Sequence, residues 1–390
     1  MLDQLDLFDE ESTRPGRHRR RRRDGGGGRS AATLLITFVA LGALVLGGWV
    51  GFNKVRDFFA PPDYEGPGTG SVTVEVKVGD YASDIGNELY NKGVVASAAA
   101  FVKAAEEDAR SREIQPGKYQ LKKKMSARAA LEALLDPKNR LVIKVTVPEG
   151  QSNVRVYRTL SEKLGVSLEE LEELDKRPTD FGIDESWFTR TDGKQAAKTL
   201  EGFLYPSTYE FDPGTTAVEA LQTMVSKFLS VAEELNLQQV AQQKNITPYE
   251  ALIVASLAEA EVVPEDLPKA TRVVYNRLEH PDAWMNKLQF DSTTNYWLEK
   301  QGKARKDSSG LTLDELNDPE NPYSTHAHAG LPPGPIGNPS NLALMAAINP
   351  EQGDWLFFVV TSEDGRSSFA ATYEEHQQNI QICKQKNLGC

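Results

Sequence analysis

The sequence predicts an α+β fold that is tied to a membrane by one N-terminal helix. Residues 30–52 contain no charged side chain, and beyond residue 72 stretches of alternating apolar and polar residues are mixed with segments of helical periodicity. A chain of 390 residues has room for two or three domains. Its 39% hydrophobic and 26% charged residues are ordinary for a globular protein, so a sizeable buried core is expected.

The charge is unevenly distributed along the chain. The formal net charge is -12, but residues 1–29 carry eight arginines against six acidic residues. The rest of the chain is therefore more acidic than the total suggests, and we do not expect the folded part to bind nucleic acid.

The N-terminus has the pattern of a membrane anchor. The basic stretch RPGRHRRRRRDGGGGR ends where the uncharged residues 30–52 begin, and about 20 apolar residues are enough to cross a bilayer. A signal peptide would have a shorter apolar core and a cleavage site, whereas this stretch continues through Trp49 and Phe52. We expect a retained single-pass anchor, with residues 1–29 in the cytoplasm and the chain after Asn53 outside it. A nuclear signal, a nucleic-acid patch or a buried core helix fits this arrangement less well.

A linker and a small α+β unit follow. Residues 53–71 end in the Pro- and Gly-rich APPDYEGPGTGS, typical of a linker, and residues 72–140 contain a strand, two helices, a second strand and a helix capped by Ser126. Within this unit, VKVGDYASDIGNELYNKGVV resembles a LysM-like module, which implies glycan binding. A role as a spacer that sets the distance from the membrane is an equal alternative.

Residues 141–390 form the predicted second domain. It begins with LVIKVTVPEG, read as one uninterrupted strand followed by a turn, and contains no Gly-rich phosphate loop, GxSxG or HExxH motif. His326 and His328 have no third ligand nearby in the sequence, so we predict neither a metal nor a cofactor. The two cysteines, Cys383 and Cys390, lack the spacing of a metal site. A disulfide between them and two thiols without function are both consistent with the sequence.

The stretch VASLAEAEVV, residues 254–263, places two carboxylates in an apolar helix. Thr247, followed by Pro248 and by Glu250 three residues after the cap, marks the helix start. Glu261 shares an apolar face with the preceding turns, whereas Glu259 lies about 200° away around the axis, so both cannot point into one cleft. A carboxyl beside apolar neighbours has a raised pKa and suits a general acid. The alternative is that the helix ends here and both glutamates are solvated.

Several separated motifs resemble the MltG-like, or YceG-like, endolytic murein transglycosylases. They are EGFLYPSTYEF at 201–211, ASLAEAEV at 255–262, VYNRL at 274–278, LQFDST at 288–293 and YSTHAHAGLPPGPIGNPS at 323–340. The resemblance implies a membrane anchor, a LysM-like subdomain and an α+β catalytic domain. It also implies that Glu261, the second glutamate of the E-x-E element, is the catalytic acid. The candidates for substrate binding are Glu259, Arg277, Gln289, Asp291, Tyr323 and Thr325.

Two departures from the family pattern concern substrate positioning. Ser292 stands where the family often has Pro, and residues 323–326 replace the frequent Y-N-T-Y. An aspartate in a turn, such as Asp291, more often caps the helix that follows it, and Arg277 can equally form hydrogen bonds and an ion pair at the surface.

The resemblance implies cleavage of the MurNAc–GlcNAc bond within nascent peptidoglycan strands, leaving 1,6-anhydro-MurNAc ends and terminating strand elongation. Cell-wall synthases are the implied partners. There are two alternatives. One is a hydrolytic muramidase with Asp291 as its second acid, and the other is a non-catalytic peptidoglycan-binding scaffold.

Overall fold

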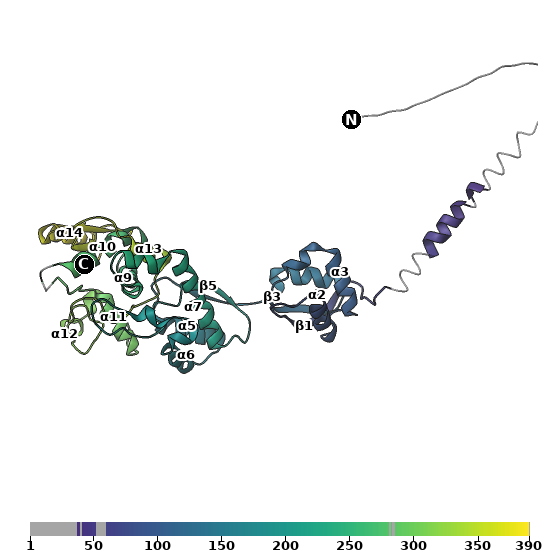
Figure 1. Cartoon of the computed structure of the whole chain (residues 1–390), viewed down its shortest axis with the longest axis horizontal. Helices are drawn as coiled ribbons and strands as arrows, with labels where there is room; N and C mark the ends of the chain where they lie inside the picture. The colour runs from purple at the N-terminus through teal and green to yellow at the C-terminus, as the bar shows by residue number, and fades with distance from the viewer. Residues whose placement is uncertain (1–36, 40, 52–59, 281, 283–284, 390) are drawn as a thin grey trace, which may run out of the picture.

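The computed structural model describes residues 37–39, 41–51, 60–280, 282 and 285–389. The basic tail and residues 30–36, 40 and 52 of the expected anchor lie outside this part. No helix among the described residues is long and apolar enough to cross a membrane. The anchor therefore stays a prediction. Beyond residue 60, Figure 1 shows a smaller folded unit that contains β1–β3 and a larger one that contains β5 and most of the helices.

The smaller unit packs three helices on a three-stranded antiparallel sheet of order β1-β2-β3. Val74 of β1 pairs with Tyr119 of β2, and both side chains are buried in a core of their own. The expected helix cap at Ser126 is present, since its hydroxyl accepts from the Ala129 backbone N–H at 3.2 Å. The elements are β1 (Pro67–Val76), α2 (Ala82–Asn91), α3 (Ala98–Glu107), η1 (Ala109–Glu113), β2 (Gly117–Met125), α4 (Ala127–Leu135), η2 (Pro137–Asn139) and β3 (Arg140–Leu141).

The strand expected at 141–150 is not continuous, so that prediction was wrong. Arg140 and Leu141 pair with β2 of the first sheet, whereas Ile143–Val147 forms β4 and pairs with β5 (Ser207–Phe211) of another sheet. The chain changes partners at Val142. An apolar run predicts extended backbone, but it does not specify which strand will supply the hydrogen bonds.

The larger unit is mostly helical and encloses α9 (Pro248–Glu261), whose residues 248–258 are all buried. The other elements before the long loop are α5 (Asn153–Leu164), α6 (Leu168–Asp175), η3 (Pro178–Phe181), η4 (Glu185–Phe188), α7 (Ala217–Glu234), α8 (Leu237–Gln243), η5 (Pro264–Asp266), α10 (Leu267–Glu279), α11 (Asp291–Lys300), η6 (Ser308–Gly310) and α12 (Leu313–Leu316). The sheets and helices together confirm the α+β fold class.

After α12 the chain runs without regular structure to α13 (Asn341–Ile348), as the aperiodic sequence there predicts. A hairpin of β6 (Phe357–Val360) and β7 (Ser367–Ala370) and the terminal α14 (Tyr373–Gln385) complete the fold. Cys383 on α14 is buried and disulfide-bonded. Cys390 lies outside the described residues.

Candidate active site

Helix α9 carries Glu261 from the core to the protein surface. The Thr247 hydroxyl accepts from the Glu250 backbone N–H at 3.1 Å, and the Glu250 carboxylate accepts from the Thr247 backbone N–H at 2.8 Å. This capping box fixes the helix start where the sequence predicts it. The helix ends at Glu261, which is partly buried, and the preceding Ala260 is exposed. The acid is thus held by a rigid element at the edge of the core.

The Glu261 carboxylate faces the first turn of α11. The Ser292 hydroxyl donates a hydrogen bond of 2.5 Å to Glu261 Oε1. Burial raises the pKa of the Glu261 carboxyl above its ordinary value, and the charge of Asp291 acts in the same direction. The Ser292 hydrogen bonds and the Arg277 charge oppose the rise. The raised pKa expected from the apolar surroundings is therefore present.

Glu259 belongs to a different part of the structure. Its carboxylate accepts from the Ser340 backbone N–H at 3.0 Å and from the Ser340 hydroxyl at 2.6 Å. Since Ser340 is the N-cap of α13, Glu259 ties α9 to the start of α13. The two glutamates face separate partners, as their angular separation predicts.

Asp291 and Gln289 lie next to Glu261's partner Ser292. Asp291 is the first residue of α11, and its Oδ1 lies 3.1 Å from His326 Nε2. Gln289 has a positive φ of 53°, which turns the chain before the helix, and its side chain is exposed. The structure therefore brings Glu261, Asp291 and Gln289 to one region of the surface.

The other three candidates, Arg277, Tyr323 and Thr325, are buried. Arg277 donates to the backbone carbonyls of Leu356 at 2.6 Å and Leu288 at 2.5 Å. The Thr325 hydroxyl accepts from the Phe290 backbone N–H at 2.8 Å. The contacts with Leu288 and Phe290 position the segment before α11. Substrate binding by Arg277 and Thr325 stays a prediction.

Tyr323 is only 6% exposed, and its ring packs on that of Tyr296 with centroids 4.8 Å apart. Its surroundings are those of a core residue. Substrate contact through Tyr323 therefore remains an untested prediction.

The roles of Ser292 and of two arginines could not be predicted from the sequence. Ser292 stands out there only as a departure from a family pattern. Arg155 pairs with the buried Glu299, which also accepts from the Ser152 hydroxyl at 2.7 Å. Arg305 is exposed and lies within electrostatic reach of Glu261, Glu299 and Arg155. No local pattern around Arg305 marks it as close to Glu261.

The region has no arrangement typical of a metal centre. Among the residues that the structure describes, no group of three or more His, Cys, Asp and Glu side chains could hold a metal ion. His326 faces Asp291 instead. Glu261 is a desolvated carboxyl at the end of a rigid helix, and it can donate and accept a proton.

The fold and this region define an α+β protein with one candidate acid–base residue. The sequence model of the YceG-like family matches residues 74–382, and the chain belongs to that family. It is 28% identical over 367 residues to an endolytic murein transglycosylase of Streptococcus pneumoniae (strain D39), covering 88% of this chain and 63% of that protein. It is 27% identical over 350 residues to an endolytic murein transglycosylase of Bacillus subtilis (strain 168), covering 86% of this chain and 90% of the relative.

The fold of this chain is similar to that of a solved structure. The crystal structure of a yceG-like protein from Listeria monocytogenes superposes with a TM-score of 0.51 at 26% identity, over 79% of this chain and 99% of that one. The chain spans 63% of the length of the pneumococcal relatives that it matches.

Proposed function

We propose that this protein is a peptidoglycan lytic transglycosylase that cleaves the MurNAc–GlcNAc bond within nascent glycan strands. The observation that carries the proposal is the position of Glu261, a desolvated carboxyl at the partly buried end of an otherwise buried helix. The names of the pneumococcal and Bacillus relatives support the same class of reaction.

In the proposed mechanism one carboxyl serves both steps. Protonated Glu261 donates its proton to the glycosidic oxygen, the bond to MurNAc C1 breaks, and GlcNAc leaves with a free 4-hydroxyl. The charge at C1 is that of an oxocarbenium ion. The Glu261 carboxylate then takes the proton of the MurNAc 6-hydroxyl while O6 bonds to C1, which closes the 1,6-anhydro ring. The carboxyl is protonated again and no water is consumed.

A hydrolytic muramidase is the second candidate, because Asp291 is a second acid whose charge acts on Glu261. Its contact with His326 Nε2 favours a positioning role instead. Mass spectrometry of the products distinguishes the two reactions, since a hydrolysed end is heavier than an anhydro end by one water. A non-catalytic scaffold would give neither product.

The acid assignment is tested by two neighbouring substitutions on one helix. Glu261→Gln removes the titratable proton at nearly constant size, and we expect a loss of about 10²- to 10⁴-fold or more in the yield of anhydro ends from purified glycan strands. Glu259→Gln should retain measurable turnover at the same concentration of folded protein. An active Glu261→Gln beside an inactive Glu259→Gln would overturn the assignment, and two active variants would refute the mechanism.

We further propose that residues 30–52 anchor the chain in a bacterial membrane, with the catalytic domain outside the cytoplasm beside the cell-wall synthases. The arginines before the uncharged span support this orientation. A reporter that is active only in an oxidising compartment should give signal when fused after Cys390 and none when fused before Met1. The reverse pattern contradicts the topology.

A further inference from the structure

One face of α11 extends from the candidate acid to a buried ion pair. Ser292, Asn295 and Glu299 are spaced three and four residues apart, so their side chains lie on the same side of the helix. Ser292 donates to Glu261, and Glu299 at the far end of the face pairs with Arg155. The step from Ser292 to Glu299 corresponds to about 10 Å along the helix axis. One extended substrate can therefore contact both ends of this face.

The middle of the same face fixes the loop that carries Arg305. The Asn295 side chain donates to the Lys306 carbonyl at 2.9 Å and accepts from the Lys306 backbone N–H at 2.8 Å. Asn295 is only 7% exposed, and the Lys306 ammonium also pairs with Glu315 at 2.6 Å. These contacts hold the backbone next to Arg305, so the loop presents its side chain from a fixed position.

Arg305 is a cation without a partner in the protein. It forms no hydrogen bond and no ion pair with any residue that the structure describes. Solvent reaches its side chain, but the surrounding protein desolvates it in part and lowers the pKa of the guanidinium, and the charge of Arg155 acts in the same direction. The charges of Glu299 and Glu261 oppose this effect. Because Arg155 already occupies Glu299, one positive charge is uncompensated while Glu261 is protonated. Such an excess of positive charge attracts an anion.

The proposed substrate supplies an anion within reach. The sugars of a glycan strand are uncharged, whereas the peptide stem on the lactyl group of MurNAc carries free carboxylates. An extended peptide advances about 3.3–3.6 Å per residue, so about 10 Å corresponds to about three residues of the stem. A guanidinium binds a carboxylate through two parallel hydrogen bonds, which fix its orientation as well as its distance.

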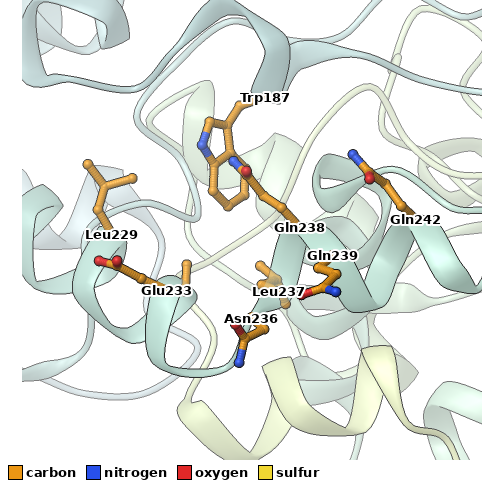
Figure 2. A pocket seen from close by; sticks show the side chains of 9 residues that line it. Trp187, Leu229, Glu233, Asn236, Leu237, Gln238, Gln239 and Gln242 are labelled. Carbon is orange, nitrogen blue, oxygen red and sulfur yellow. The ribbon is translucent and has the colours of Figure 1, made fainter.

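A large hollow elsewhere on the larger unit does not offer this chemistry. It measures about 490 Å³ and lies between η4, the end of α7 and α8, and Glu233 is the one charged side chain of its lining (Figure 2). The other lining residues are apolar or carry amides. A carboxylate in this hollow would meet a like charge.

We infer that Arg305, supported by the charge of Arg155, binds a carboxylate of the peptide stem on the MurNAc at which Glu261 acts. The Arg305 guanidinium takes the carboxylate through two hydrogen bonds, and Arg155 stays paired with Glu299. The contact holds the sugar in register with the acid and selects strands whose stems are present and charged. The identity of the substrate rests on the proposed function, whereas binding at Arg305 requires no turnover.

The test measures binding separately from cleavage. The full chain carrying Glu261→Gln, in a neutral detergent, binds dye-labelled uncrosslinked glycan strands without cutting them, and fluorescence anisotropy gives the Kd. Three forms of the same strands are compared: strands with intact stems, strands whose stem carboxylates are converted to amides, and strands whose stems are removed, which leaves a lactyl carboxylate on MurNAc. Strands with intact stems should bind at least about tenfold more tightly than either of the others.

Arg305→Gln should abolish this preference. Its Kd for strands with intact stems should rise at least about tenfold, and its Kd for amidated strands should stay the same. Lys303→Gln removes a charge from the same exposed loop and should change neither value. Arg155 is left in place, because its loss would deprive the buried Glu299 of its ion-pair partner. With Glu261 restored, Arg305→Gln should raise KM for strands with intact stems and leave kcat nearly unchanged.

Three outcomes overturn the inference: equal Kd values for intact and amidated strands, an unchanged preference in Arg305→Gln, or an equal loss of affinity in Lys303→Gln. Tightest binding by the strands without stems assigns Arg305 to the lactyl carboxylate and overturns it as well. An inactive wild-type protein that still prefers intact stems contradicts the proposed reaction alone. An active one without the preference contradicts this site alone.

Discussion

At the scale of single residues, the protonation of Glu261 depends on two opposing effects. Burial raises the pKa of the carboxyl, and the Ser292 hydroxyl lowers it by donating to the charged form. The same carboxyl must be protonated to start the proposed reaction and ionised to finish it. Ser292 is therefore placed to balance the two states, although its position in the sequence marks it only as a departure from a family pattern.

Removing the Ser292 hydroxyl should shift the balance toward the protonated form. In Ser292→Ala the pKa of Glu261 rises further, because desolvation remains and the opposing hydrogen bond is lost. The limb of the pH profile on which activity falls as Glu261 ionises should therefore move to higher pH. The measurement is the pH dependence of kcat/KM for anhydro-end formation. Ser292→Thr keeps a hydroxyl and serves as the control. Coincident pH profiles for Ser292→Ala and the wild type would refute the role of Ser292 in setting the pKa of Glu261.

At the scale of elements, the region around Glu261 depends on how α9 meets α11 and α13. Ser340 caps α13 through the Ala343 N–H at 3.1 Å and also donates to Glu259, two residues before Glu261. The Glu259–Ser340 contact thus fixes the last turn of α9 against a second helix.

Ser340→Ala should weaken the Glu259–Ser340 contact. Loss of the cap and of the hydroxyl's hydrogen bond to Glu259 should lower the free energy of unfolding by about 1–2 kcal/mol, measured by urea denaturation, while the backbone N–H of residue 340 still donates to Glu259. Thr372→Ala removes the comparable cap of α14 and is the matched control. We expect both variants to lose stability, but only Ser340→Ala to lose activity at equal folded concentration. Equal activity of Ser340→Ala and Thr372→Ala would mean that the Glu259–Ser340 contact does not position Glu261.

Individual helices could be predicted from the sequence better than the contacts between them. The start of α9 follows from local capping residues, and its enclosure follows from its apolar composition. The Glu261–Ser292 and Glu259–Ser340 pairs join residues 31 and 81 positions apart, so no local periodicity contains them. The same limit explains the wrong strand at 141–150, where the choice of partner changes at Val142.

At the scale of the whole molecule, a second buried carboxyl links distant parts of the larger unit. Glu201 is 3% exposed and accepts from the Asn153 backbone N–H and the Tyr296 hydroxyl, both at 2.9 Å. Asn153 starts α5 and Tyr296 lies on α11, so Glu201 joins two helices that are far apart in sequence. Burial, followed by the charge of Asp175, raises the pKa of Glu201 to about 8.

This raised pKa makes the stability of the fold depend on pH. Between pH 4.5, the ordinary value of the carboxyl, and about 8, the folded protein holds a proton at Glu201 that the unfolded chain releases. The protonated Glu201 therefore contributes to the free energy of unfolding in full below pH 4.5, and this contribution declines as the pH rises toward the folded pKa. The decline between pH 4.5 and pH 7 is about 3 kcal/mol. Glu201→Gln keeps the proton-bound shape and should flatten the decline in unfolding free energy between pH 5 and 8. Glu185→Gln, at an exposed pair with Lys198, should leave the slope as it is. Parallel slopes for Glu201→Gln and the wild type would show that Glu201 is ionised in the folded protein at neutral pH.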